Sequence, residues 1–129
     1  MTPELTVLAL AAILQAMQIM LAGGSMNRDA GLAWNASPRD TPREFSALTG
    51  RLRRAVANHF EALALFTIAV VVVTLSGSAS GLTAVCAWLY LAARILYVPA
   101  YAFGWSPWRS LIFAVGAAAT LVMLLAALF

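Results

Sequence analysis

Four polar side chains recur at helical spacing within residues 50–66. Arg51, Arg54, Asn58 and Glu61 follow one another at intervals of three, four and three residues, which places them on one face of a helix. Guanidinium groups bind carboxylates, a glutamate binds an ammonium group, and an amide can orient either. The residue types on this face are therefore suited to a small zwitterionic ligand.

A second polar face is predicted for a later apolar segment. Arg94, Tyr97 and Tyr101 recur there at intervals of three and four residues, and Arg109 follows shortly after them. A helical repeat again brings the first three to one face, and Arg109 falls in the predicted first turn of the next helix. We expect the two polar faces to lie at the same level of the fold.

The charges on these faces require partners, because an unpaired charge in hydrocarbon costs about 3 kcal/mol or more. Two interpretations remain open. Glu61, Arg54 and Arg94 could satisfy one another in a structural network. Alternatively, with Asn58 and the tyrosines, they form the pocket for a zwitterion that the first face suggests.

The composition determines the class of protein in which these residues must be positioned. The chain has 129 residues, of which 63% are hydrophobic and 10% charged, with a mean hydropathy of +0.88. These values indicate an integral membrane protein. The net charge of +3 comes with no lysine and no polar surface over which basic and aromatic residues are spread, so nucleic acid is not an expected partner.

Four apolar segments are each long enough to cross a bilayer, which requires about 20 helical residues. We therefore predict an all-α integral membrane fold, a four-helix transmembrane bundle forming one domain over residues 1–129. The expected spans and the polar loop are, in order, about 4–23, the loop 26–45, 46–75, 82–103 and 107–128. Ser106 is predicted to cap the last helix, with Pro107 at its first position.

The arginines also predict the orientation of the chain. Six of the eight lie between Arg28 and Arg54, whereas the turn at residues 76–81 contains no basic residue. By the positive-inside rule, the 26–45 loop is cytoplasmic and both termini are external. Both polar faces then lie toward the cytoplasmic side.

Three other polar residues are expected to pack within the bundle. Gln15 and Gln18 share a face of the first span and should contact other helices. His59 lies off the main polar face and has no second histidine or cysteine at ligand spacing. We therefore predict a packing or interfacial histidine and no metal site.

The two polar faces together resemble the signature of the MAPEG family, the membrane-associated proteins of eicosanoid and glutathione metabolism. The similar residues are Arg51-x-x-Arg54-Ala55-x-x-Asn58-x-x-Glu61 with Phe66, Arg94-x-x-Tyr97-x-x-x-Tyr101, Arg109-Ser110, Pro42-Arg43-Glu44-Phe45 and Leu14-Gln15-Ala16. The resemblance covers essentially the whole chain. It implies a homotrimer of four-helix protomers, with glutathione as co-substrate between neighbouring subunits near the cytoplasmic face.

The resemblance also implies a role for each polar residue. Glu61 would bind the γ-glutamyl amine, and Arg109 would lie nearest the thiol as the catalytic residue. The other implied glutathione ligands are Arg51, Arg54, Asn58, Arg94, Tyr97 and Tyr101. An arginine and a helix N-terminus both favour a thiolate, so the implied role of Arg109 agrees with its chemistry.

Three function classes follow. The first is a glutathione-dependent transferase or peroxidase that acts on a lipophilic small molecule arriving from the membrane lipid. The second is a non-catalytic lipophile-binding or scaffold protein of the same fold. A transporter is disfavoured, because the charges cluster at one level with no polar path through the other half. The short connections resemble the bacterial branch of the family, which implies a bacterial inner membrane.

Overall fold

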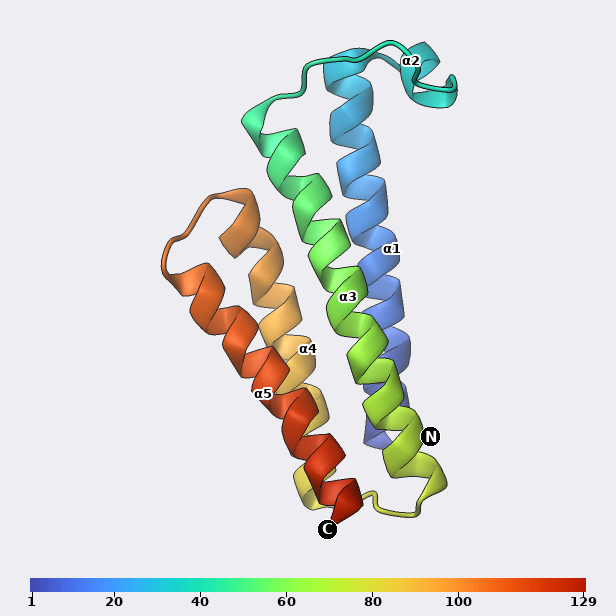
Figure 1. Cartoon of the computed structure of the whole chain (residues 1–129), viewed down its shortest axis with the longest axis vertical. Helices are drawn as coiled ribbons and strands as arrows, with labels where there is room; N and C mark the ends of the chain where they lie inside the picture. Colours follow the sequence, from blue (N-terminus) through green and yellow to red (C-terminus); the bar gives the residue numbers. More distant parts are fainter.

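The computed structural model describes residues 1–129 as an all-helical bundle without strands (Figure 1). Its elements are α1 (Pro3–Ala30), α2 (Leu32–Ala36), α3 (Ala47–Leu75), α4 (Gly81–Ala102) and α5 (Trp108–Leu128). All except α2 are long and apolar enough to cross a membrane. The chain is therefore a multi-pass integral membrane protein, and the predicted fold class is confirmed.

The first helix begins at a regular cap and runs further than predicted. The Thr2 side chain accepts a hydrogen bond from the Leu5 amide at 3.3 Å, and Pro3 occupies the first turn. The expected end near residue 23 is wrong, because Gly23 and Gly24 continue the helix. It ends at Gly31, whose φ of 90° is a conformation that favours glycine.

Residues 26–45 are only partly a loop. Residues 26–30 belong to α1, and α2 follows directly, so the prediction of a loop from residue 26 is corrected. The Asp29 carboxylate accepts hydrogen bonds from the Ser46 amide at 2.9 Å and from the Thr49 hydroxyl at 2.5 Å. Ser46 in turn caps α3 by accepting from the Thr49 amide. These contacts fasten the end of α1 to the start of α3.

The starts of the last two helices differ in how they are capped. Ser80 and Thr83 form a reciprocal capping box at the start of α4. At α5 the predicted cap is wrong: Pro107 itself occupies the cap position, and no side chain caps the helix. The Arg109 amide instead donates to the Trp105 carbonyl at 2.9 Å, so the preceding turn supplies the acceptor that Ser106 was expected to provide.

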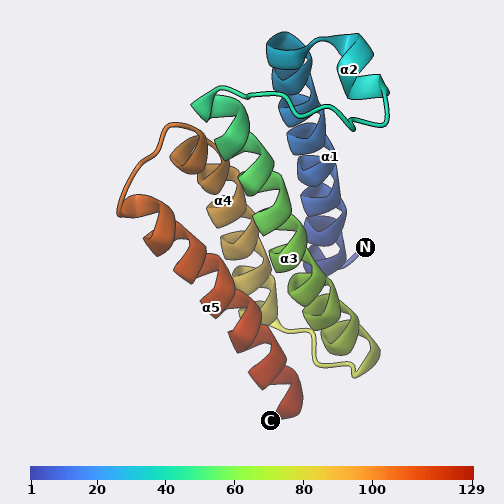
Figure 2. The ribbon, with the colours of Figure 1, turned by 45° about the horizontal axis from the view of Figure 1, so that its top comes forward.

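The helices form two antiparallel pairs, α1 with α3 and α4 with α5, and the pairs pack together through contacts of α4 with α1 and α3 and of α3 with α5. α1 packs mainly against α3, α4 packs mainly against α5, and α1 and α5 make no contact with each other. Figure 2 shows α1 and α5 on opposite sides of the bundle. We call the end that carries α2 and the α4–α5 connection the arginine end, and the end that carries both termini the terminal end (Figure 1).

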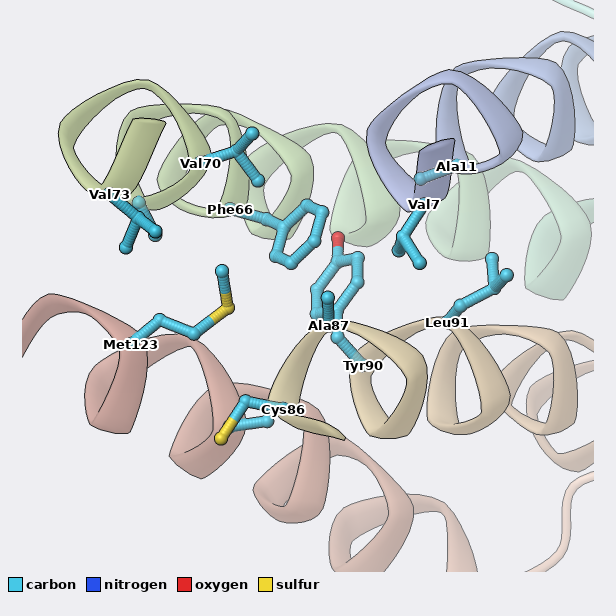
Figure 3. Packing of buried hydrophobic residues seen from close by; sticks show 12 residues of the cluster. Val7, Ala11, Phe66, Val70, Val73, Cys86, Ala87, Tyr90, Leu91 and Met123 are labelled. Carbon is cyan, nitrogen blue, oxygen red and sulfur yellow. The ribbon is translucent and has the colours of Figure 1, made fainter. Parts of the chain in front are cut away.

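The apolar core lies toward the terminal end. The rings of Phe66 and Tyr90 stack in parallel with centroids 3.9 Å apart, and Val7, Val70 and Met123 pack around them (Figure 3). These side chains are buried, and they come from α1, α3, α4 and α5. In a bilayer, where the alternative environment of these side chains is lipid, such packing stabilises the fold through van der Waals contacts. The core thereby fixes the relative position of the helices that carry the polar faces.

Candidate functional site

The two predicted polar faces meet between α3, α4 and α5 on the arginine side of the core. Asn58 on α3 contacts Arg94 on α4: Nη1 of the arginine donates to the Asn58 Oδ1 atom at 3.1 Å. Arg94 is only 2% exposed, and its guanidinium carbon lies 4.2 Å from the centre of the Tyr97 ring. A cation over an aromatic face is a favourable contact. The structure thus joins three of the predicted residues.

Tyr101 lies between two arginines. Nε of Arg54 donates to its hydroxyl at 3.1 Å, and the guanidinium carbon of Arg109 lies 4.8 Å from its ring centre. The Tyr97 and Tyr101 rings are 5.6 Å apart, so both tyrosines line the same strip of α4. Residues from three helices are therefore held together through the two aromatic rings.

Arg51 makes a different kind of contact. Its Nε atom donates to the Ala102 carbonyl at 2.8 Å. Ala102 is the last residue of α4, where carbonyl groups have no partner within the helix. Arg51 therefore ties the start of α3 to the end of α4, whatever else it binds.

Glu61 is the exception among the predicted residues. Its side chain is exposed, and it forms neither an ion pair nor a hydrogen bond within the chain. The one ion pair in the chain joins Arg28 and Asp29 at 3.5 Å. A structural network in which Glu61 pairs with Arg54 or Arg94 is thus not present within the chain, and any partner of this carboxylate comes from outside it.

A cavity of about 210 Å³ opens at the junction of the two faces. It is lined by Asn58, Tyr97, Arg109, Ser110 and Phe113. Arg109 stands in the first turn of α5, where the helix dipole adds to the positive charge of the guanidinium. Both features stabilise an anion such as a thiolate. No carboxylate lines this cavity.

A second cavity lies next to the first, further from the arginine end. It has a volume of about 280 Å³, and its walls come from α3, α4 and α5. Phe113 lines both cavities, and Arg94 and Tyr90 line only the second. Sequence reasoning did not single out Tyr90. The available signal was its position four residues before Arg94, which extends the same helical face toward the core.

The other polar cluster lies on the side of α3 that faces α1. His59 is fully buried, with Nδ1 at 2.6 Å from Gln15 Oε1 and 3.0 Å from Gln18 Nε2. Gln15 also donates to the Val56 carbonyl at 3.2 Å. The predicted packing roles of the two glutamines and of His59 are confirmed.

Buried Glu4 is a further polar residue for which the sequence suggested only a place in the first turn. It is 1% exposed, and its Oε1 atom accepts a hydrogen bond from the Thr83 hydroxyl at 2.5 Å. The contact joins the starts of α1 and α4 at the terminal end. No signal in the sequence paired two residues so far apart along the chain.

Comparison with known families identifies the chain. The family model of the MAPEG family matches residues 4–129, and the chain therefore belongs to the MAPEG family, as the resemblance of its two polar faces predicted. The family is a four-helix membrane bundle, is generally related to glutathione and includes glutathione transferases and peroxidases among other members, which typically form oligomers. No individual curated protein matches the chain.

Proposed function

We propose that the protein is a glutathione-dependent membrane transferase or peroxidase that acts on lipophilic electrophiles or hydroperoxides. The observation that supports this proposal is the 210 Å³ cavity at the junction of the polar faces. Arg109 lines this cavity and Arg94 lies over the lining ring of Tyr97, while Arg54 lies over the neighbouring Tyr101; none of the three arginines forms an ion pair within the chain. A ligand that brings two carboxylates, as glutathione does, matches this excess of guanidinium groups.

Each polar residue has a role in this proposal. Arg54, Asn58, Arg94, Tyr97 and Tyr101 bind and orient the glutathione backbone, with Arg51 at the edge of the group. Arg109 stabilises the thiolate, which is the nucleophilic form of the thiol. The thiolate then attacks the electrophilic atom of the second substrate.

Glu61 supports the assembly that we propose. Its carboxylate is exposed on a membrane-spanning helix, where contact with lipid alone would be costly. In a homotrimer, with glutathione between neighbouring protomers, Glu61 binds the γ-glutamyl amine and is shielded from lipid. The site is then complete only in the assembled protein.

We further propose that the protein lies in a bacterial inner membrane with the arginine end in the cytoplasm and both termini outside. Six arginines lie between residues 28 and 54 at the arginine end, and the α3–α4 turn has none. This distribution follows the positive-inside rule. In the proposed orientation the cavity lies toward the cytoplasm, where glutathione is available to it.

Thermal unfolding with and without glutathione tests the proposed site. A ligand that binds only the folded protein at 100 times its dissociation constant adds about 2.7 kcal/mol of stability. We expect millimolar glutathione to raise the melting temperature of the purified protein, and its γ-glutamyl-free dipeptide Cys-Gly to give a smaller shift because it cannot reach Glu61 in the same way. An unchanged melting temperature at millimolar glutathione would contradict the proposal.

Turnover separates the proposed enzyme from the alternative, a non-catalytic lipophile-binding or scaffold protein of the same fold. The apolar cavity of about 280 Å³ is compatible with either, since both bind a lipophile. Stabilisation by glutathione together with conjugation of a chromogenic electrophile supports the enzyme. Stabilisation without conjugation across a panel of lipophilic electrophiles and hydroperoxides supports the alternative.

A further inference from the structure

The segment that joins α1 to α3 borders a cavity that the proposed function does not use. The cavity has a volume of about 480 Å³ and lies at the arginine end, between the end of α1, α2 and residues 37–43. Figure 1 shows this segment extending sideways from the end of α1. The charged residues that line the cavity are Arg39, Asp40 and Arg43, and none of them lines the 210 Å³ cavity. The two cavities are therefore separate.

Hydrogen bonds within the segment hold it in a defined shape. The Trp34 Nε1 atom donates to the Thr41 carbonyl at 2.6 Å and closes the segment into a loop. Arg39 has a φ of 64°, which is uncommon outside glycine. Its Nε atom donates to the Asn35 carbonyl at 2.9 Å, and its Nη2 atom donates to the Asn35 Oδ1 atom. The Arg39 guanidinium is thus held at the cavity before any ligand binds, and its Nη1 atom has no partner within the chain.

The charge of the cavity is unbalanced. Two guanidinium groups and one carboxylate line it, which leaves one positive charge. Arg43 is exposed and forms neither an ion pair nor a hydrogen bond within the chain. The surrounding sequence adds to this charge, because residues 28–54 contain six arginines and only three acidic residues. Arginine binds phosphate oxygens through charge-assisted hydrogen bonds, so a phosphodiester with one negative charge complements the cavity.

The cavity lies close to the membrane surface. α1 continues to Ala30, seven residues or about 10 Å beyond the apolar segment that ends near residue 23. The head-group layer of a bilayer is about 5–8 Å thick on each side of the hydrocarbon. Ala30 lines the cavity and is thus near the outer edge of this layer. Trp34 also lines the cavity, and tryptophan is enriched at membrane interfaces. The phosphates of the surrounding lipids can therefore reach the cavity.

We propose that this cavity binds the head group of an anionic phospholipid from the surrounding bilayer, with phosphatidylglycerol as the simplest case. The lipid phosphate accepts hydrogen bonds from Nη1 of Arg39 and from the guanidinium of Arg43. Phosphatidylcholine fits less well, because its head group has no net charge to balance that of the cavity and of the surrounding arginines. The bound lipid links α2 to the membrane surface and stabilises the folded protein.

Thermal unfolding of the purified protein in a non-ionic detergent tests this site. The protein is titrated with dioctanoyl phosphatidylglycerol and, separately, with dioctanoyl phosphatidylcholine. We expect phosphatidylglycerol to raise the melting temperature in a saturable manner, and phosphatidylcholine to bind about tenfold more weakly. Glycerol phosphate, which has the phosphate but no acyl chains, should cause no rise at the same concentrations. A rise with glycerol phosphate would indicate a site for soluble phosphate esters and overturn the lipid assignment.

Arg43→Gln removes one guanidinium from the cavity without breaking any contact within the chain. It should weaken phosphatidylglycerol binding about tenfold, the effect of losing a charge-assisted hydrogen bond. The matched control is Arg28→Gln, which removes the same charge at the same end from a residue that pairs with Asp29 at 3.5 Å and does not line the cavity. It should weaken binding by no more than about twofold. Equal losses in the two variants, or no saturable rise with phosphatidylglycerol, would overturn the inference.

The glutathione experiment on the same samples shows that the two proposals are independent. Arg43→Gln should retain the glutathione-dependent rise in melting temperature, because residue 43 does not line the 210 Å³ cavity. Glutathione stabilisation without phosphatidylglycerol binding overturns only the lipid site. Phosphatidylglycerol binding without glutathione stabilisation supports the lipid site and overturns the proposed enzyme.

Discussion

Two polar clusters contact α3, and two adjacent residues of this helix, Asn58 and His59, belong to one cluster each. His59 faces α1, where it contacts Gln15 and Gln18, and Asn58 contacts Arg94 near α5 and its cavities. The first cluster is made of an imidazole and two amides and is buried among helices. The second contains guanidinium groups, opens into cavities and has no carboxylate from the chain. Both clusters leave buried polar atoms without a partner, Gln18 Oε1 and His59 Nε2 in the first and Nε and Nη2 of Arg94 in the second. Only the second leaves a buried charge unpaired, which is the feature expected of a binding site for an anion.

The largest effect that this comparison predicts is on turnover. Arg109→Ala should lower the rate of glutathione conjugation about 10²–10³-fold, the loss typical of removing one group that stabilises a developing or reacting anion. Glutathione affinity should change far less, because Arg54 beside Tyr101 and Arg94 beside Tyr97 remain available to bind its carboxylates. Steady-state kinetics with a chromogenic electrophile, combined with the thermal shift, measure the two separately.

Arg53→Ala is the matched control for Arg109→Ala. Arg53 is exposed and lies over the Phe45 ring, with its guanidinium carbon 5.1 Å from the ring centre and away from the 210 Å³ and 280 Å³ cavities. It should conjugate at the rate of the unmodified protein. If Arg109→Ala conjugates as fast as Arg53→Ala, Arg109 has no role in activating the thiol.

The next largest effect is expected on the free energy of unfolding, when the cluster of His59, Gln15 and Gln18 is disrupted. His59→Ala removes a fully buried ring and leaves the Gln15 and Gln18 side chains without a shared partner. A loss of about 2–4 kcal/mol is expected from the cavity and the unpaired amides. Thermal unfolding in detergent without glutathione measures it.

Phe60→Ala serves as the control for this prediction, since Phe60 follows His59 directly but is 63% exposed. In detergent this substitution should shift the melting temperature much less. Equal losses in the two variants would show that the His59 cluster does not hold α1 to α3. The rise in melting temperature caused by glutathione should be the same in both variants, because neither side chain lines the 210 Å³ cavity.

Much of this comparison follows from periodicity and hydropathy. Apolar segments of bilayer length predicted four helices, and the three- and four-residue spacing predicted that Asn58 would share a face with Arg54, near Arg94. Helix ends were less predictable: Gly23 and Gly24 tolerate a helix interior, and the positive φ that ends α1 falls at Gly31. Any glycine can adopt a positive φ, so the sequence does not determine at which glycine the helix ends.

The partners of buried polar groups were not predictable in the same way. Spacing along one helix assigns a residue to a face but does not identify the helix opposite, so Glu4 with Thr83 and Tyr90 beside the second cavity required the packed structure. Glu61 is the opposite case, because its partner was proposed from the sequence but is not found within the chain. Its position on the polar face was predicted, with Arg54, Arg94 or a ligand amine as its partner, and the structure shows no partner for it within the chain.

The smallest predicted effect tests the difference between the two clusters most directly. Asn58→Asp keeps the size of the side chain and gives Arg94 a carboxylate at the position where it now contacts an amide oxygen at 3.1 Å. If Arg94 is left without a counter-charge so that a ligand can supply it, this substitution should stabilise the ligand-free protein by about 1 kcal/mol, the usual gain where function has been exchanged for stability. The same carboxylate repels those of glutathione, so the affinity should fall about tenfold, which corresponds to about 1.4 kcal/mol.

A purely structural role of Arg94 would not combine a gain in stability with a loss of glutathione affinity. Asn27→Asp makes the same chemical change on α1, where Asn27 contacts Asn35 outside the 210 Å³ and 280 Å³ cavities, and it should alter neither quantity in this coupled way. Thermal unfolding at increasing glutathione concentration gives both stability and affinity from one titration. A destabilised Asn58→Asp variant with unchanged glutathione affinity would mean that Asn58 and Arg94 are a structural pair, and that α3 has two packing clusters rather than a packing cluster and a site.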